Sequence, residues 1–128
     1  MPSLGKHDGL AFQKIREVEE IDNARLGNEC KIDTSKGRLQ FGVECQRRMN
    51  AVLSTLKPAD PTSTVEWGMA DNSKVTLTFE ELRDLITEAD ALAGPKLVRA
   101  FQYAQLLKTR FRGGVAVTQR EIAPENWI

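Results

Sequence analysis

The chain has 128 residues, of which 41% are hydrophobic and 28% charged, as in an ordinary globular domain with or without a tail. Its 18 Lys and Arg residues balance its 18 Asp and Glu residues, so the net charge is zero. Proteins that bind nucleic acids usually carry an excess of basic residues, and the zero net charge therefore argues against a nucleic-acid partner. No apolar run approaches the length of a membrane-spanning helix, and the first residues lack the apolar region of a secretory signal, so we expect no membrane partner.

The N-terminal part of the chain predicts an irregular arm followed by a helix. Residues 1–10 contain one proline and two glycines, which do not favour a regular element. A helix is predicted over residues 11–26, with Asp8 near its N-terminus and Gly27 as the residue that ends it. Its apolar positions recur at spacings of three and five residues: Phe12, Ile15, Val18, Ile21 and Leu26.

A hairpin and a second helix are predicted next. Residues 30–34 and 38–41 alternate in polarity and flank Ser35-Lys36-Gly37, which predicts a β-hairpin with a three-residue connection. Residues 43–56 predict a helix, which Pro58 ends. The apolar residues of this helix fit the helical period: Cys45, Met49, Val52, Leu53 and Leu56.

A second hairpin leads into a third helix. Residues 64–69 and 74–77 alternate in polarity on either side of Asp71-Asn72, two residues that favour turns. Thr78 follows, with Glu81 three residues later. This spacing is typical of a capping box, in which each of the two side chains accepts a hydrogen bond from the other residue's backbone amide.

The third helix carries an apolar stripe as far as Phe111, but Gly94-Pro95 interrupts it. Because proline lacks an N–H and clashes with the preceding turn, we expect either one sharply kinked helix or two helices that meet there. Gly113-Gly114 ends the helical pattern, and residues 113–128 are expected to form an extended tail. The predicted fold is α+β: a single helix-dominated domain over residues 11–112 with two short hairpins and a long C-terminal helix, followed by the tail.

The charges are unevenly distributed along the chain. Seven acidic and two basic residues lie in residues 65–94, whereas six basic and two acidic residues lie in residues 95–128. One interpretation is a solvated helix whose charges follow its dipole. A second is complementary pairing between subunits. A third, a nucleic-acid site, has thin support because only four bases are spread over residues 99–112.

No motif in the chain predicts catalysis. Glycine-rich phosphate loops and the H-E-x-x-H pattern are absent from the sequence. A zinc site needs about four Cys or His ligands, and the chain has only Cys30, Cys45 and His7, which do not cluster. We therefore predict no enzyme, no metal and no cofactor. The two cysteines are expected to be reduced thiols; a Cys30–Cys45 disulfide is the alternative.

The stretch from about Ile15 to Phe111 resembles a bacteriophage domain of uncharacterised function found in tail-fibre, tail-fibre-assembly and baseplate-associated proteins. The best match runs from Trp67 to Glu81 in the order W-x-x-A-D-N-x-x-V-x-L-T-x-x-E, and Phe41 followed by Gln46 adds to it. The resemblance implies a short hairpin with a Trp feeding a long helix. This sequence departs from the family pattern at Gly94-Pro95, because the long helix is usually uninterrupted in the family. The tail has no counterpart in the family pattern.

The resemblance implies a non-enzymatic structural component of a phage tail: a baseplate, fibre-attachment or fibre-associated subunit, located in the virion tail after assembly in the host cytoplasm. Its partners would be other tail proteins and copies of itself, as a homo-oligomer. The alternative is a tail-fibre assembly chaperone that is absent from the mature virion; a small host-takeover protein or an enzyme is a third reading. Apolar residues on more than one face of the long helix and in the tail are the candidate interface: Phe101, Tyr103, Phe111, Trp127 and Ile128.

Overall fold

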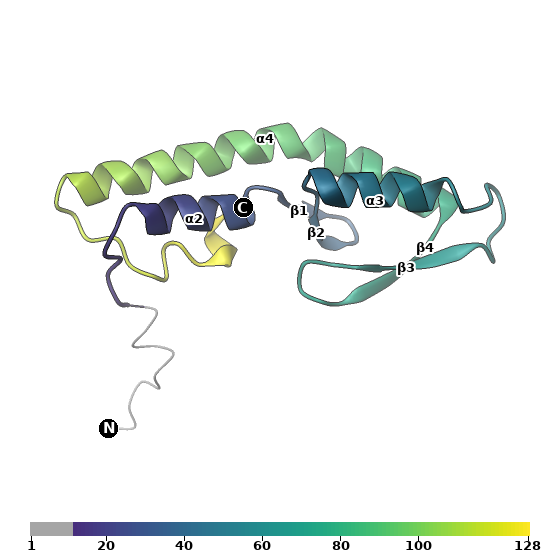
Figure 1. The fold of residues 1–128 in the computed structure, drawn as a ribbon, viewed down its shortest axis with the longest axis horizontal. Helices are drawn as coiled ribbons and strands as arrows, with labels where there is room; N and C mark the ends of the chain where they lie inside the picture. Colours follow the sequence, from purple (N-terminus) through teal and green to yellow (C-terminus); the bar gives the residue numbers. More distant parts are fainter. Residues whose placement is uncertain (1–11) are drawn as a thin grey trace, which may run out of the picture. The chain divides into compact units, whose positions relative to one another are not determined.

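A computed structural model describes residues 12–128, within which the chain forms three α-helices and two antiparallel β-hairpins (Figure 1). The α+β class predicted from the sequence is confirmed. The expected irregular arm and Asp8 lie outside the described residues. The elements in chain order are α2 (Glu19–Asn28), β1 (Lys31–Thr34), β2 (Gly37–Gln40), α3 (Val43–Leu53), β3 (Thr64–Gly68), β4 (Lys74–Thr78), α4 (Phe79–Arg112) and the 3-10 helix η1 (Pro124–Asn126).

The chain divides into two compact units, and α4 contributes residues to both of them. The central unit comprises residues 30–96, and the terminal unit comprises the described residues of 12–29 together with 97–128. This division differs from the expected domain over residues 11–112 with a separate tail, because residues 113–128 belong to the terminal unit.

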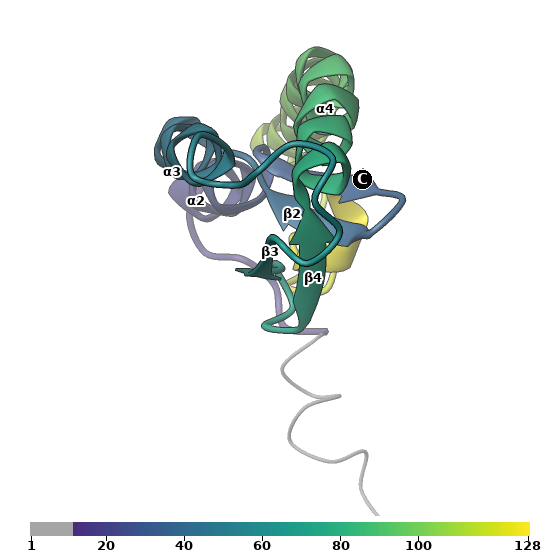
Figure 2. The same cartoon turned by 90° about the vertical axis from the view of Figure 1, so that its right-hand side faces the viewer.

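The core of the central unit is formed by both hairpins, α3 and the first part of α4. Figure 2 shows β4 leading directly into α4. Trp67 of β3 is half-buried and packs against this core rather than lying within it. The buried members of the core are Ile32, Leu39, Phe41, Met49, Met69, Leu77, Leu82, Leu85 and Ala89.

The two hairpins differ in how well the sequence anticipated them. In the first, Thr34 pairs with Gly37, so the connection is the two residues Ser35 and Lys36; the expected three-residue connection is wrong. Gly37 has a φ of +121°, which other residues rarely adopt and which lets the strand resume at once. In the second hairpin, Asp71 Oδ1 accepts hydrogen bonds from the backbone N (3.0 Å) and Oγ (2.5 Å) of Ser73. The predicted Asp-Asn turn is confirmed.

The start of α4 is fixed by the capping box. The Glu81 backbone N donates to Thr78 Oγ1 at 3.3 Å, and the Thr78 backbone N donates to Glu81 Oε1 at 3.0 Å. Both amides would otherwise lack partners at the helix terminus. Lys36 Nζ adds an ion pair to Glu81 at 3.2 Å. The predicted helix start is therefore confirmed in its atomic detail.

Pro95 does not break α4. The helix continues from Phe79 to Arg112 with Pro95 inside it, so of the two arrangements expected at Gly94-Pro95 the structure has the single helix and not two helices that meet there. Pro95 cannot donate to the carbonyl of Ala91, one turn earlier. Because both residues are exposed, water can satisfy that carbonyl, and the penalty of an interior proline is reduced.

The boundaries of the other two helices are also corrected. The expected helix over residues 11–26 begins only at Glu19 and passes through Gly27 to Asn28. Its start is set by the carboxylate of Glu20, which accepts hydrogen bonds from the backbone amides of Arg16 (2.5 Å) and Glu17 (3.0 Å). Helix α3 ends at Leu53 instead of Leu56, in a turn where the Leu56 amide donates to the Leu53 carbonyl.

Candidate interaction surface

The C-terminal segment, residues 113–128, begins where a Schellman motif ends α4. The Val115 amide donates to the Arg110 carbonyl at 2.9 Å, and the Gly114 amide donates to the Phe111 carbonyl at 3.1 Å. Gly114 has a φ of +80°, the left-handed conformation that this motif requires. The predicted helix end at Gly113-Gly114 is confirmed, and the motif turns the chain back along the terminal unit.

The C-terminal segment is folded against its own unit and is not an extended tail, which corrects the expectation from the sequence. The Ile15 amide donates to the Val117 carbonyl at 2.8 Å, and the Gln119 amide donates to the Gln13 carbonyl at 2.7 Å. Gln119 Nε2 also donates to Glu20 Oε1 at 2.9 Å. Figure 1 shows α2 and the yellow C-terminal segment together beside the second part of α4. The buried residues of this unit are Ile15, Ile21, Ala100, Ala104, Leu107, Val117 and Trp127.

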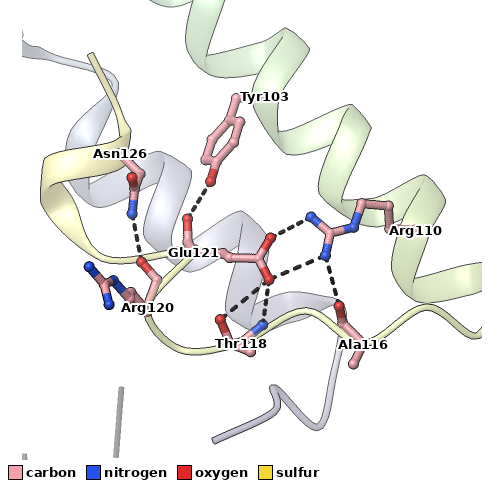
Figure 3. A network of polar contacts seen from close by, with 7 residues as sticks. All are labelled: Tyr103, Arg110, Ala116, Thr118, Arg120, Glu121 and Asn126. Carbon is pink, nitrogen blue, oxygen red and sulfur yellow. Dashed lines mark hydrogen bonds and ion pairs between the residues drawn. The ribbon is translucent and has the colours of Figure 1, made fainter. Parts of the chain in front are cut away.

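Glu121 holds the middle of the segment to α4 (Figure 3). Its carboxylate forms a two-pronged ion pair with Arg110, and it accepts hydrogen bonds from the backbone N (3.1 Å) and Oγ1 (3.3 Å) of Thr118. Arg110 Nη2 also donates to the Ala116 carbonyl at 2.9 Å. Tyr103 Oη donates to the Glu121 carbonyl at 2.6 Å. Two α4 side chains, Tyr103 and Arg110, therefore hold the segment at Ala116 and Glu121.

The charges in this network shift one another's pKa. The hydrogen bonds from Arg110, with that from the Thr118 amide, lower the pKa of Glu121 below its ordinary value of 4.5. The Glu121 carboxylate in turn raises the pKa of Arg110. Burial, followed by the nearby Glu121 charge, raises the pKa of Tyr103. Glu121 and Arg110 are therefore ionised and Tyr103 is neutral at neutral pH. These are the protonation states in which the ion pair and the hydrogen bonds hold the C-terminal segment to α4.

Trp127, expected at an interface, belongs instead to the core of its own chain. It is 1% exposed, its Nε1 donates to the Ile122 carbonyl at 3.0 Å, and its ring meets Tyr103 edge-on at 4.9 Å between centroids. Arg99 Nε donates to the backbone oxygen of Ile128 at 3.0 Å. Trp127 thus has no surface to offer a partner, because the segment that carries it folds back.

The other four candidate residues fall into two groups. Tyr103 and Phe111 are half-buried and pack against the core of the terminal unit. Phe101 is 57% exposed and Ile128 is 66% exposed, so both remain available to a partner. Two neighbours of Phe101 on α4, Leu97 and Val98, are also exposed and were not chosen from the sequence. Both residues fit the apolar pattern of the sequence, but that pattern does not show which face of α4 the C-terminal segment covers.

The central unit carries an open hollow of about 500 Å³. Its lining mixes apolar and charged residues: Gln40, Cys45, Arg48, Glu66, Trp67, Gly68 and Met69. No disulfide joins Cys45 to Cys30. Over residues 12–128, no three His, Cys, Asp or Glu side chains gather closely enough to hold a metal ion. None of the helices described here has the length and apolar character to cross a membrane.

Comparison with known proteins identifies the family of the chain without assigning it an activity. A family model described as a domain of unknown function (DUF4376) matches residues 11–122. No curated protein and no solved structure matches the chain significantly. The match spans both units and includes Glu121 and its partners on α4. The chain therefore belongs to the DUF4376 family.

Proposed function

We propose that this protein is a non-enzymatic structural component of a bacteriophage tail, a baseplate, fibre-attachment or fibre-associated subunit. It would act through contacts with other tail proteins and with copies of itself, in the virion tail, after assembly in the host cytoplasm. The observation that carries the contact role is the exposed apolar group Leu97, Val98 and Phe101 on α4. Adjacent exposed apolar side chains on a folded unit favour a protein partner.

The best-defined polar groups of the chain have structural roles, which favours a function in protein contacts over a function in catalysis. The Thr78–Glu81 pair caps a helix, and Asp71 holds a turn. Glu121 joins the C-terminal segment to α4. Each of these groups has a structural task in the fold. The placement in a phage tail is supported by the resemblance carried by Trp67, the Ala70-Asp71-Asn72 turn and the strand and helix that follow.

Quantitative mass spectrometry of purified virions, compared with lysate of infected cells, tests this role. A structural subunit should be found in virions at a fixed copy number relative to other tail proteins. A tail-fibre assembly chaperone would be present in the lysate and absent from the virions. That second outcome would overturn the proposal in favour of the chaperone.

A further inference from the structure

We propose that an extended segment of a partner protein binds along the free edge of β3 as an added strand, in the open hollow of the central unit. Every residue that lines this hollow belongs to the central unit, residues 30–96. The inference adds a second contact surface to the proposed function and does not depend on a phage tail. Such a ligand is recognised by its extended backbone and by the alternation of its side chains.

The hydrogen bonds of the second hairpin show which backbone groups of β3 are free. The Met69 amide donates to the Ser73 carbonyl at 2.7 Å, so these two residues form a bonded pair. Bonded and non-bonded pairs alternate along an antiparallel ladder. Gly68 and Glu66, one and three positions before Met69, therefore stand in non-bonded pairs with β4. Their backbone N–H and C=O groups point away from β4, toward the outer edge of the hairpin.

These outward groups of β3 have no hydrogen-bond partner elsewhere in residues 12–128. Gly68 and Glu66 are both exposed, and both line the hollow. Unpaired backbone groups along a strand edge are a template to which another strand can add. Proline and lysine commonly protect such edges, and β3 contains neither of them. The edge is therefore open to a second backbone.

The opposite wall of the hollow presents the edge of another strand, β2. The Phe41 amide donates to the Cys30 carbonyl at 2.8 Å, and by the same alternation the backbone groups of Gln40 and Arg38 point away from β1. The Arg38 carbonyl accepts a hydrogen bond from the Ala70 amide at 2.8 Å, where the two hairpins meet. No further backbone hydrogen bond joins β2 to β3, and Gln40 lines the hollow together with β3. The hollow therefore lies between two strand edges.

Gly68 gives an independent reason to expect a backbone against this edge. A Cβ added at Gly68 would meet nothing within 4 Å, so the packing of the chain does not require glycine there. Glycine weakens the interior of a strand, and it often marks a place where a ligand or another backbone approaches closely. An added strand accounts for the glycine, since the side chains of that strand would occupy the space beside Gly68.

The two faces of β3 specify the side chains of the ligand. Val65 and Trp67 pack against the core, whereas Glu66 is exposed. An added strand continues both faces, so its apolar residues should alternate with polar ones. Glu66 forms no ion pair among the described residues, whereas Arg48 of the hollow lies 3.6 Å from Glu44. A basic residue opposite Glu66 therefore completes the match.

A separate segment fits this edge better than a second copy of the chain does. Two β3 strands paired antiparallel about Glu66 would bring their Glu66 carboxylates opposite each other, and like charges in that position are destabilising. A separate segment can place a basic residue there instead. The hollow has a volume of about 500 Å³, which lies in the range of binding sites for small ligands and suits one short segment.

An NMR titration of the full chain with a synthetic peptide tests the proposal. The probe is acetyl-Thr-Val-Lys-Val-Thr-amide, which alternates in polarity and can place its lysine opposite Glu66. The backbone amide signals of Glu66 and Gly68 should shift and saturate at millimolar peptide, and those of the terminal unit should not. The same peptide with the backbone nitrogen of its lysine methylated should bind about three- to tenfold more weakly, because one donor to β3 is lost.

Two proline variants that block opposite edges of the same hairpin provide the matched control. Gly68→Pro removes an outward N–H from the free edge of β3 and should weaken peptide binding about three- to tenfold. Thr76 faces Glu66 in the ladder, so Thr76→Pro removes an outward N–H from the far edge of β4 and should leave binding unchanged. Neither change removes a β3–β4 hydrogen bond. Circular dichroism and thermal melting establish that each variant is folded.

Several outcomes would overturn the proposal. They include no shift at millimolar peptide, shifts away from β3 and Gln40, and equal effects of the two proline variants. Undiminished binding of the methylated peptide also overturns it, without any change to the protein. So does equal binding of a peptide with glutamate in place of lysine, which should bind less tightly beside Glu66. A chain that dimerises alone and that Gly68→Pro makes monomeric would assign the edge to a second copy instead. None of these outcomes changes the copy number in virions, so the tail role is tested separately.

Discussion

Truncating Trp127 should destabilise the protein as a core substitution does. The side chain is 1% exposed, so Trp127→Ala removes a fully buried indole from the terminal unit, at a cost of about 3–5 kcal/mol. That cost includes the hydrogen bond from Nε1 to the Ile122 carbonyl and the edge-on contact with Tyr103. Since domains are stable by only about 5–15 kcal/mol, a large part of the stability is lost.

Urea unfolding followed by circular dichroism measures this loss, with Ile128→Ala as the matched control. Ile128 is the next residue but is 66% exposed, so its truncation should change the free energy of unfolding by less than about 0.5 kcal/mol. Hydrogen exchange of the Ile15 amide, which donates to the Val117 carbonyl, should accelerate in the Trp127 variant. A variant of unchanged stability but lower assembly mass would refute the reasoning and make Trp127 an exposed anchor.

Three further predictions concern the cap, the ion pair and the thiols. Thr78→Ala should cost about 1 kcal/mol in thermal or urea unfolding, because the Glu81 amide loses its acceptor; an unchanged stability would mean that the cap contributes nothing. The pKa of Glu121 is lowered in the folded state, so its contribution to stability is present above pH 4.5 and lost as the pH falls below that value. The stability difference between wild type and Glu121→Gln should therefore be largest at neutral pH and shrink in acid; a constant difference would contradict the ion pair with Arg110. Thiol titration of the denatured, unreduced protein should find two thiols per chain, and a count of zero would contradict the reduced state of Cys30 and Cys45.

Local signals in the sequence predicted local structure well. The capping box at Thr78 and Glu81, the turn at Asp71-Asn72 and the helix end at Gly113-Gly114 each depend on residues within a few positions of one another. Their hydrogen bonds form wherever the segment lies in the fold. Such features can therefore be predicted from residue type and spacing alone.

Features that depend on distant contacts could not be predicted in this way. The bond from Gln119 to Glu20 joins residues 99 positions apart, and the pairing of Ile15 with Val117 replaces the first turns of a helix that the sequence favoured. The burial of Trp127 has the same origin, since it depends on the return of the C-terminal segment to α4. Continuation of α4 through Pro95 depends on its exposure, which the periodicity of the sequence does not reveal.

The central claim is that the chain is a structural part of a phage tail. Immunogold electron microscopy of intact virions, with an antibody raised against the purified chain, tests this claim most directly because it locates the protein. The account predicts gold particles at one fixed position on the tail of most virions. Label on the capsid, or virions without label from a lysate that contains the protein, would contradict it.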